Sequence, residues 1–356
     1  MIAERRVGVL VVGAGPAGLA VAASLAAAGV GRVEVVEREA EAGGVPRYCA
    51  HGGFGTWTRP LTGPGYARLL AEAARRAGAV IRTGVTVLDW AAVEPTGSGG
   101  DADGTSSGRA DAPASVSYGG GRAGIASGGP GPVLTAVGPG GLERIAARAV
   151  VLATGARERP RAARLVPGTR PAGVYTTGEL QQSVHLYGQP IGTRAVVVGA
   201  EEVSYAAAGT LRAAGTDVVA LVTVHARAQV PPLRARSARL GRAVPLLTDT
   251  TVTEVLGHGR LSGVRVRHRD GRTATLPCDT IVFTGDFVAE NELAHRAGIT
   301  LGTSPHTSRP DVFAAGGVLR PGQRARAATR DGAAAAGAVL EWLGADDRRR
   351  TVHRSV

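Results

Sequence analysis

A glycine-rich turn between two β-branched runs constrains the fold of this chain more than any other stretch. The apolar run from Val7 to Val12 ends at the turn 13–18, which reads GAGPAG, and an Ala/Leu-rich helical stretch follows. A second apolar run, Val33 to Val36, then ends at Glu37, about 20 residues beyond the last glycine of the turn. This order of strand, turn, helix and strand predicts a βαβ unit.

Each glycine of the turn has a separate role in binding a dinucleotide. Gly13 allows the tight turn, Gly15 lets the backbone approach a pyrophosphate, and Gly18 lets the helix pack on the strand. The helix start presents N–H groups and its positive dipole end to phosphates, and Glu37 is placed to bind ribose hydroxyls. We therefore expect a bound dinucleotide here, rather than a βαβ unit that binds nothing.

The composition excludes several other classes of protein. The chain has 356 residues, enough for two domains, and a net charge of +12 that comes from Arg alone, since the sequence contains no Lys. A Schiff-base lysine and a Walker-type phosphate lysine are thus excluded. Aromatic residues make up 4% of the chain and form no stacking platform with Arg, so we expect no nucleic-acid partner. We interpret the excess Arg mainly as solvated surface.

Reactive side chains and targeting signals are few. Cys49 and Cys278 are too far apart in sequence for a metal or disulfide framework, and a buried, inert thiol is the favoured interpretation of Cys49. His51 is the candidate for acid–base work near the cofactor, with a loop histidine bonded to backbone as the alternative. No signal peptide and no apolar run of about 18 residues occur, so we expect a cytoplasmic protein without a membrane span.

A second βαβ pattern spans residues 193–224, but its turn is altered. The turn 199–204 reads GAEEVS and keeps only the first glycine. Glu201 stands where the backbone would approach a pyrophosphate, and like charges repel strongly in a partly desolvated site. Its second strand also ends without an acid. A second dinucleotide-type fold is predicted, with an NAD(P) site in it disfavoured; a 2′-phosphate site at Arg227, Arg234 and Arg236 is the weaker alternative.

The remaining segments give the expected organisation. Residues 244–283 alternate as a β-meander, and the strand-ending pairs Thr154-Gly155 and Thr284-Gly285 suggest two crossings between nested domains. The expected fold class is α/β, with two nested Rossmann-like domains in three layers and added β-meanders. Its expected parts are a first domain in 1–160 and 286–346 with a flexible low-complexity insertion at 95–132, a second domain in 161–285, and a charged tail in 347–356.

The order of these motifs resembles the two-dinucleotide-domain flavoproteins of the pyridine nucleotide–disulfide oxidoreductase superfamily, which have a glutathione-reductase-like fold. More narrowly, residues 43–70, 152–182 and 195–223 resemble the FAD-containing α-type subunit of hydrogen cyanide synthase and of heteromeric hydroxyproline, sarcosine or opine dehydrogenases. The resemblance implies FAD in the first domain. The cofactor-binding residues expected from the motifs and the resemblance are Gly13, Gly15, Pro16, Ala17, Gly18, Glu37, Arg38, Gly44, Arg47, Val87, Thr154, Gly155, Gly316, Gly317, Arg324 and Ala325.

The resemblance also implies partners. In those complexes a second flavoprotein subunit oxidises the small-molecule amine or amino acid, and this type of subunit carries electrons onward. The chain departs from the family in lacking a Cys pair and a cysteine-rich region after Cys278, and in having Gly317 where an acid often stands. Dithiol chemistry is therefore excluded. We expect no metal within the chain, and an iron–sulfur centre, if used, to come from a small [2Fe–2S] partner protein.

Three functions follow from the sequence. The leading hypothesis is an FAD-dependent, electron-transferring subunit of a heteromeric amine or amino-acid dehydrogenase. The first alternative is a self-contained NAD(P)H-dependent flavoprotein reductase of the thioredoxin- or ferredoxin-reductase type, against which Glu201 counts. The second alternative is a non-catalytic scaffold or nucleotide-binding subunit, suggested by Gly317 and the missing cysteine-rich region.

Overall fold

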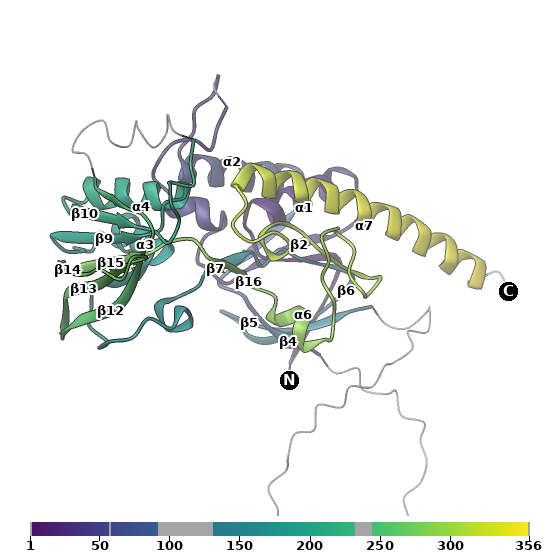
Figure 1. Ribbon diagram of the computed structural model, residues 1–356. Coiled ribbons are helices and arrows are strands. Elements are labelled where there is room, and N and C mark those ends of the chain that lie inside the picture. Colours follow the sequence, from purple (N-terminus) through teal and green to yellow (C-terminus); the bar gives the residue numbers. More distant parts are fainter. Residues whose placement is uncertain (1, 57, 92–130, 232–243, 355–356) are drawn as a thin grey trace, which may run out of the picture.

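Two large sheets, one mixed and one parallel, lie side by side in the structure, a computed structural model that describes residues 2–56, 58–91, 131–231 and 244–354 (Figure 1). The seven-stranded sheet uses strands from both ends of the described chain, whereas the five-stranded sheet uses strands from its middle. We refer to each sheet with its covering elements as the first and the second unit. The α/β fold with nested Rossmann-like units, predicted from the two βαβ patterns, is confirmed.

The first unit is built on the predicted βαβ motif. Its strand order is β3-β2-β1-β6-β5-β4, with β17 beside β6, and β5 pairs antiparallel with both β6 and β4. β1 and β2 pair in parallel with Val9 opposite Val33. The strands are β1 (Ala3–Val12), β2 (Val33–Glu37), β3 (Val80–Thr83), β4 (Thr86–Trp90), β5 (Val133–Gly138), β6 (Gly141–Leu152) and β17 (Val312–Ala314).

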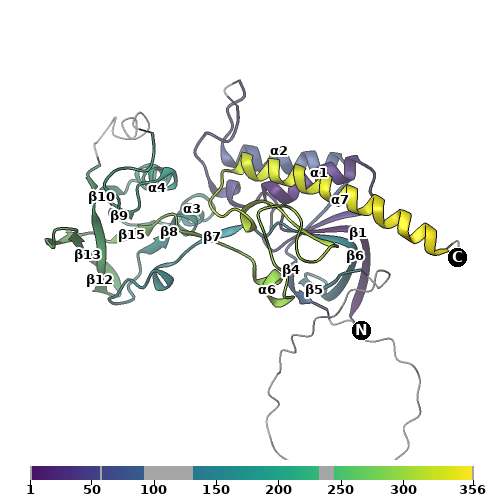
Figure 2. The same cartoon turned by 45° about the vertical axis from the view of Figure 1, so that its right-hand side comes forward.

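Helices cover one face of this sheet. α1 (Pro16–Ala27), α2 (Gly63–Arg76) and α7 (Ala325–Arg354) lie on the same side, and α7 runs past the body of the unit (Figures 1 and 2). A Cβ on Gly332 of α7 would overlap the carbonyl oxygen of Ala17, so a glycine is needed where the two helices cross. The apolar side chains of α1, α2 and α7 pack on those of β1, β2 and β6 as one buried cluster.

The ends of two helices have clear local causes. α2 begins at Gly63, because Thr62 caps it by accepting the N–H of Gly65 at 3.4 Å. The segment 347–356, expected as a charged tail, begins inside α7, which continues to Arg354. Shorter elements complete the unit: η1 (Val45–Tyr48), α6 (Glu292–Arg296) and η3 (Gly316–Val318).

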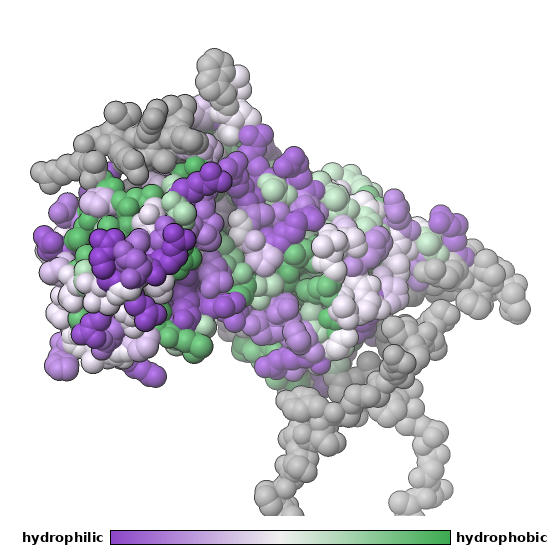
Figure 3. Space-filling view, viewed as in Figure 1, coloured by the Kyte–Doolittle hydropathy of each residue, from purple (hydrophilic) through white to green (hydrophobic). Residues whose placement is uncertain are grey.

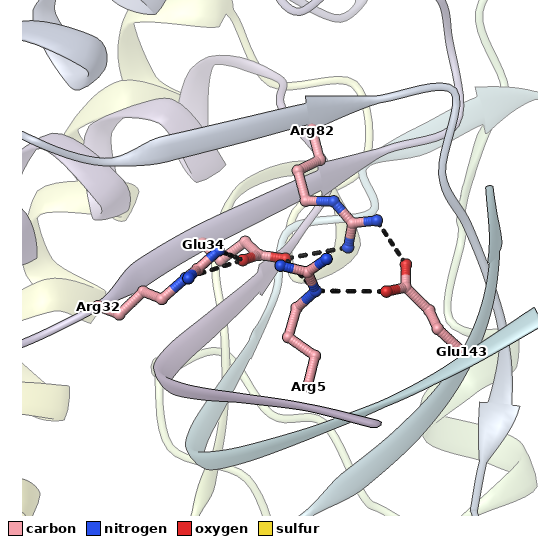
Figure 4. Close-up of polar contacts among 5 residues, drawn as sticks. All are labelled: Arg5, Arg32, Glu34, Arg82 and Glu143. Carbon is pink, nitrogen blue, oxygen red and sulfur yellow. Dashed lines mark hydrogen bonds and ion pairs between the residues drawn. The ribbon is translucent and has the colours of Figure 1, made fainter. Parts of the chain in front are cut away.

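A charge network ties the strands of the first unit together near their amino ends (Figure 4). Glu34 of β2 is fully buried, and its carboxylate lies 3.0 Å from both Arg32 and Arg82 and 3.8 Å from Arg5. Glu143 of β6 lies 2.6 Å from Arg82 and 3.3 Å from Arg5. These guanidinium groups offset the cost of burying the Glu34 carboxylate in the sheet.

The second unit repeats the architecture around a wholly parallel sheet of order β11-β10-β9-β15-β8. α3 and α4 pack on one face, and the antiparallel sheet β12-β13-β14 packs on the other. The elements are η2 (Arg161–Arg164), β8 (Val174–Thr176), α3 (Thr177–His185), β9 (Arg194–Val198), α4 (Glu202–Ala213), β10 (Asp217–Val222), β11 (Leu246–Leu247), β12 (Thr250–His258), β13 (Arg260–His268), β14 (Thr273–Pro277) and β15 (Thr280–Phe283).

The prediction of a β-meander over residues 244–283 is correct only for the strands β12, β13 and β14. β12, β13 and β14 form a meander, whereas β11 pairs with β10, and β15 lies in parallel between β9 and β8. The fully buried residues of β15 explain this, because an interior parallel strand is apolar on both faces.

Both connections between the units follow a Thr-Gly pair. β7 (Ala156–Glu158) follows Thr154-Gly155, β16 (Phe287–Ala289) follows Thr284-Gly285, and the two strands pair antiparallel. The Thr154 hydroxyl donates to the Glu290 carbonyl at 2.6 Å and joins the two segments again. β4 and β5 pair as the arms of a hairpin, as expected around the insertion, most of which lies outside the described residues.

The face of the molecule shown in Figure 3 carries both hydrophilic and hydrophobic residues. Hydrophilic side chains alternate with hydrophobic ones over both units in the view of Figure 3. Of the helices that the structure describes, none combines the length and the hydropathy needed to cross a membrane.

Candidate functional site

The turn between β1 and α1 is as tight as its glycines suggest. Gly13 has a φ of +103°, and a Cβ there would overlap the carbonyl oxygen of Ala153. A Cβ on Gly18 would overlap the carbonyl oxygen of Gly13. Since both overlaps are with backbone, the packing of the chain itself requires these two glycines.

Gly15 is different, because nothing in the described chain explains its lack of a side chain. Its backbone is extended, with φ −77° and ψ −177°, and apart from its chain neighbours no described heavy atom lies within 4 Å of a Cβ built there. Gly15 is the N-cap of α1, and Pro16 and Ala17 form the first turn. Within the described residues no side chain caps this helix, and no acid lies in its first turn. An uncapped, acid-free helix start beside open space suits an anionic ligand.

Glu37 holds its carboxylate at the end of β2, next to this turn. The residue is 8% exposed, and its two oxygens accept the N–H of Ala14 at 2.8 Å and of Glu39 at 3.0 Å. A carboxylate has about four acceptor positions, so further ones remain for the hydroxyls of a ligand. Arg38, the next residue, is largely exposed and lies 3.8 Å from Glu39.

The loop at Gly43-Gly44 closes the other side of the turn. Gly44 has a φ of +60°, and a Cβ there would lie 2.8 Å from the Cα of Gly15. The Gly43 N–H donates to the Ala14 carbonyl at 2.8 Å. Arg47 follows on η1, and its Nε is buried without a hydrogen-bond partner among the described residues; Glu41 lies 3.4 Å away as an ion-pair partner. This buried guanidinium N–H, orphaned except for the Glu41 carboxylate, is a candidate donor to a phosphate or another acceptor that binds beside it.

The backbone at Gly316-Gly317, late in the chain, also lies beside the start of α1. Gly316 has a φ of +80°, and a Cβ there would lie 2.6 Å from the Cβ of Ala17. A Cβ on Gly317 would lie 3.2 Å from the carbonyl carbon of Gly155, which itself has a φ of +85° and open space around it. The structure therefore brings the predicted glycines of three distant segments together around the start of α1. We call this space the glycine crevice.

Three other predicted residues lie on its margins. Val87 is half-buried on β4, two residues after Val85, whose N–H donates to the Glu37 carbonyl at 2.8 Å. Ala325 is the first residue of α7. Arg324 turns toward the second unit, where its Nη2 and Nε lie 2.8 and 2.9 Å from Oε2 of Glu202.

His51 lies in an exposed loop after η1. Its Nδ1 is 2.8 Å from the carbonyl oxygen of Gly52, and its ring centroid is 5.3 Å from that of Phe54. This geometry matches the alternative of a loop histidine bonded to backbone.

A buried polar cluster between η1 and α3 was not predicted. Glu158 of β7 accepts the N–H of Gly178 at 3.0 Å and of Gly285 at 2.9 Å, and burial raises the pKa of its carboxyl. The Cys49 thiol donates to Oε1 of Gln181 at 3.1 Å. Burial, followed by the charge of Glu158, raises the pKa of Cys49 to about 12. At neutral pH this thiol is therefore protonated and a poor nucleophile.

Cys49 lies in the first unit and Cys278 in the second, and both are buried and unpaired as thiols. In the part of the chain that the structure describes, no three His, Cys, Asp or Glu side chains are grouped to hold a metal ion.

The fold and the glycine crevice together define a two-unit, dinucleotide-binding type of oxidoreductase. The chain belongs to the pyridine nucleotide-disulphide oxidoreductase family, whose model matches residues 7–332. Proteins of this family are flavin-dependent oxidoreductases and typically bind FAD.

One curated relative and two solved structures are among the proteins that this chain resembles. The sarcosine oxidase subunit alpha of Rhizobium meliloti (strain 1021) is 33% identical over 158 residues, which are 44% of this chain and 15% of that subunit. The T. acidophilum thioredoxin reductase superposes with a TM-score of 0.70 at 20% identity, over 95% of this chain and 99% of that one. The L-proline dehydrogenase from P. horikoshii gives a TM-score of 0.66 at 16% identity, over 97% of this chain and 57% of that one. At such identities the two structures are evidence for the fold alone.

Proposed function

We propose that this chain is the FAD-containing, electron-transferring subunit of a heteromeric dehydrogenase that oxidises amines or amino acids. When bound, FAD supplies the hydride and electron transfer, and the protein supplies binding, orientation and electrostatics. The glycine crevice supports FAD as the ligand, because it combines an uncapped helix start, an acid at the end of β2 and an orphaned guanidinium N–H.

The proposal gives each part of the crevice a task. The backbone N–H groups of Gly15, Ala17 and Gly18 face the diphosphate. The Glu37 carboxylate accepts hydrogen bonds from the hydroxyls of the adenosine ribose. The guanidinium of Arg47 donates to a phosphate or to the flavin. The backbone at Gly316-Gly317 and the start of α7 lie toward the flavin end of the cofactor.

The observation that carries the choice between functions is the state of the cysteines. The fold is shared with thioredoxin reductases, yet the two thiols of this chain lie in different units and are both buried. Electrons cannot leave through a dithiol of this chain, which counts against the thioredoxin-reductase alternative and leaves an external donor or acceptor, for which we propose a partner protein. The partial identity to a sarcosine oxidase subunit favours an amine or amino acid as the ultimate donor, oxidised by a second flavoprotein subunit.

Purification with and without a co-expressed amine-oxidising subunit tests the proposal. We expect a yellow protein that releases FAD on denaturation and retains the second subunit, with a small [2Fe–2S] protein as a further partner. Its flavin should be reduced when the complex receives an amine. A flavin reduced by NADPH alone would favour the self-contained reductase. A colourless protein that cannot be reconstituted with FAD would favour the scaffold.

A further inference from the structure

The second unit keeps the backbone of a nucleotide-binding turn. Gly199 follows β9 with a φ of +134°, and its N–H donates to the Val222 carbonyl of β10 at 2.8 Å. A Cβ there would overlap the hydroxyl of Thr284. Packing therefore requires Gly199, just as it requires Gly13 in the first unit. Any difference in ligand binding between the two turns must come from the residues that follow these glycines.

Glu201 fills the space at the start of α4. It is the N-cap of this helix, and its N–H donates to the hydroxyl of Ser204 at 3.2 Å. Its carboxylate lies against Gly285, so closely that a Cβ on Gly285 would overlap Oε1 of Glu201. Gly285 has a φ of +66° and belongs to the second connection between the units. The carboxylate is thus wedged between the helix start and the connecting segment.

The guanidinium of Arg164 contacts the same connecting segment as this carboxylate and acts on its charge. Arg164 is half-buried and donates to the carbonyl oxygens of Gly285 at 2.7 Å and Thr284 at 3.1 Å. Its charge acts on Glu201 to lower the pKa of the carboxyl, but burial outweighs it and raises that pKa. The start of α4 therefore already holds a partly desolvated acid, and the guanidinium of Arg164 is bonded to the neighbouring backbone.

The next residue links the same helix to the first unit. Oε2 of Glu202 lies 2.8 Å from Nη2 and 2.9 Å from Nε of Arg324, the residue that precedes α7. The first turn of α4 thus contacts the margin of the glycine crevice. Glu201 contacts the connecting segment at Gly285, whereas Glu202 pairs with Arg324 of the first unit.

We infer that the start of α4 is a joint between the two units, closed by Glu201, and is not a pyridine-nucleotide site. The residues present do not fit the diphosphate of NAD(P)H, because its charge would enter a space that an acid occupies. Nor does an acid follow β10 to bind the adenosine ribose: the strand ends at Val222, followed by Thr223 and Val224.

Calorimetric titration of the purified protein with NADPH and with NADH tests this inference. Glu201→Ser removes the charge and retains a good N-cap residue. Wild type should show no saturation, whereas E201S should bind at least one dinucleotide about 100-fold more tightly. Glu254→Gln, which removes an acid of β12 that pairs with Arg265, is the matched control and should titrate like wild type.

Two results would overturn the inference: saturable binding to wild type at micromolar NADPH, or an E201S titration as weak as that of wild type. Hydrogen exchange of residues 199–206 supplies an independent readout. Protection should fall in Glu202→Arg and in Arg324→Glu and return when both are combined, and unchanged protection in the single variants would contradict a joint. FAD content is measured separately in every sample, so failure of the proposed function remains distinguishable.

Discussion

Gly44 approaches Gly15 so closely that a Cβ on Gly44 would lie 2.8 Å from the Cα of Gly15. Two glycine loops about thirty residues apart in sequence thus form opposite sides of one crevice. A Cβ on Gly15 itself would meet open space, whereas one on Gly18 would overlap backbone. We therefore expect the glycine at position 15 to be needed for ligand binding and the glycine at position 18 to be needed for the fold.

Gly15→Ala should reduce FAD binding without unfolding the protein. The added methyl enters open space in the ligand-free chain, so the free energy of unfolding of the apoprotein should change by less than about 1 kcal/mol. FAD per chain, measured from absorbance after denaturation, should fall at least about tenfold because the methyl meets the diphosphate. Gly18→Ala is the control and should lower the unfolding free energy by about 1–3 kcal/mol or more. Equal FAD content in wild type and G15A would contradict the assignment.

Glu34→Gln should strongly destabilise the first unit. The substitution leaves Arg5, Arg32 and Arg82 facing a neutral amide at a fully buried position. Breaking such a buried pair costs about 3–5 kcal/mol, to be measured by urea unfolding. Glu254→Gln, whose partner Arg265 is half-exposed, should cost under about 1 kcal/mol. If the two variants lost equal stability, the network in Figure 4 would not be a main support of the sheet.

Cys49 and Cys278 should both resist thiol reagents in the native protein. Burial is the main cause that raises the pKa of Cys49 to about 12 and of Cys278 to about 11. At pH 8 a disulfide reagent that reports thiolate by absorbance should label neither residue until denaturant is added, and should then label both. Rapid labelling of one thiol in the folded chain would show a reactive cysteine and weaken the argument against dithiol chemistry.

Asp279 should make the second unit sensitive to acid. Partial burial opposes ionisation, but hydrogen bonds from Thr193 and Arg194 outweigh it and lower the pKa of Asp279 to about 2. A lowered pKa contributes stability above the ordinary value of 3.8, and this contribution is lost as the pH falls toward 2. The melting temperature of Asp279→Asn should lie below that of wild type at pH 6, and the gap should narrow as the pH falls from 3.8 toward 2. A gap independent of pH would contradict the prediction.

The sequence predicted those parts of the fold and site that depend on local patterns. The unit β1-α1-β2 could be predicted because the apolar runs, the glycines and Glu37 are close in sequence and each has a defined spacing. The convergence of Gly44, Gly155 and Gly316 followed from the resemblance to a known family. In the structure each of these three glycines has a positive φ and lies at the glycine crevice.

The rest depends on contacts that no local pattern contains. Glu158 is half-buried because β7 pairs with β16 and because the start of α3 contacts it, so an acid in an Arg/Pro-rich stretch gave no signal. The ion pair of Glu202 with Arg324 joins residues 122 positions apart. β15 was assigned to the meander because alternation alone does not reveal that a short strand enters the middle of a parallel sheet.

The central claim is that this chain holds a flavin which exchanges electrons with a partner protein and not with a pyridine nucleotide. Anaerobic titration of the FAD-loaded complex, followed by the visible absorbance of the flavin, tests it most directly. The account predicts that excess NADH or NADPH leaves the absorbance unchanged and that an amine substrate of the partner subunit bleaches it. Stoichiometric bleaching by NADPH in the absence of any partner would contradict the account.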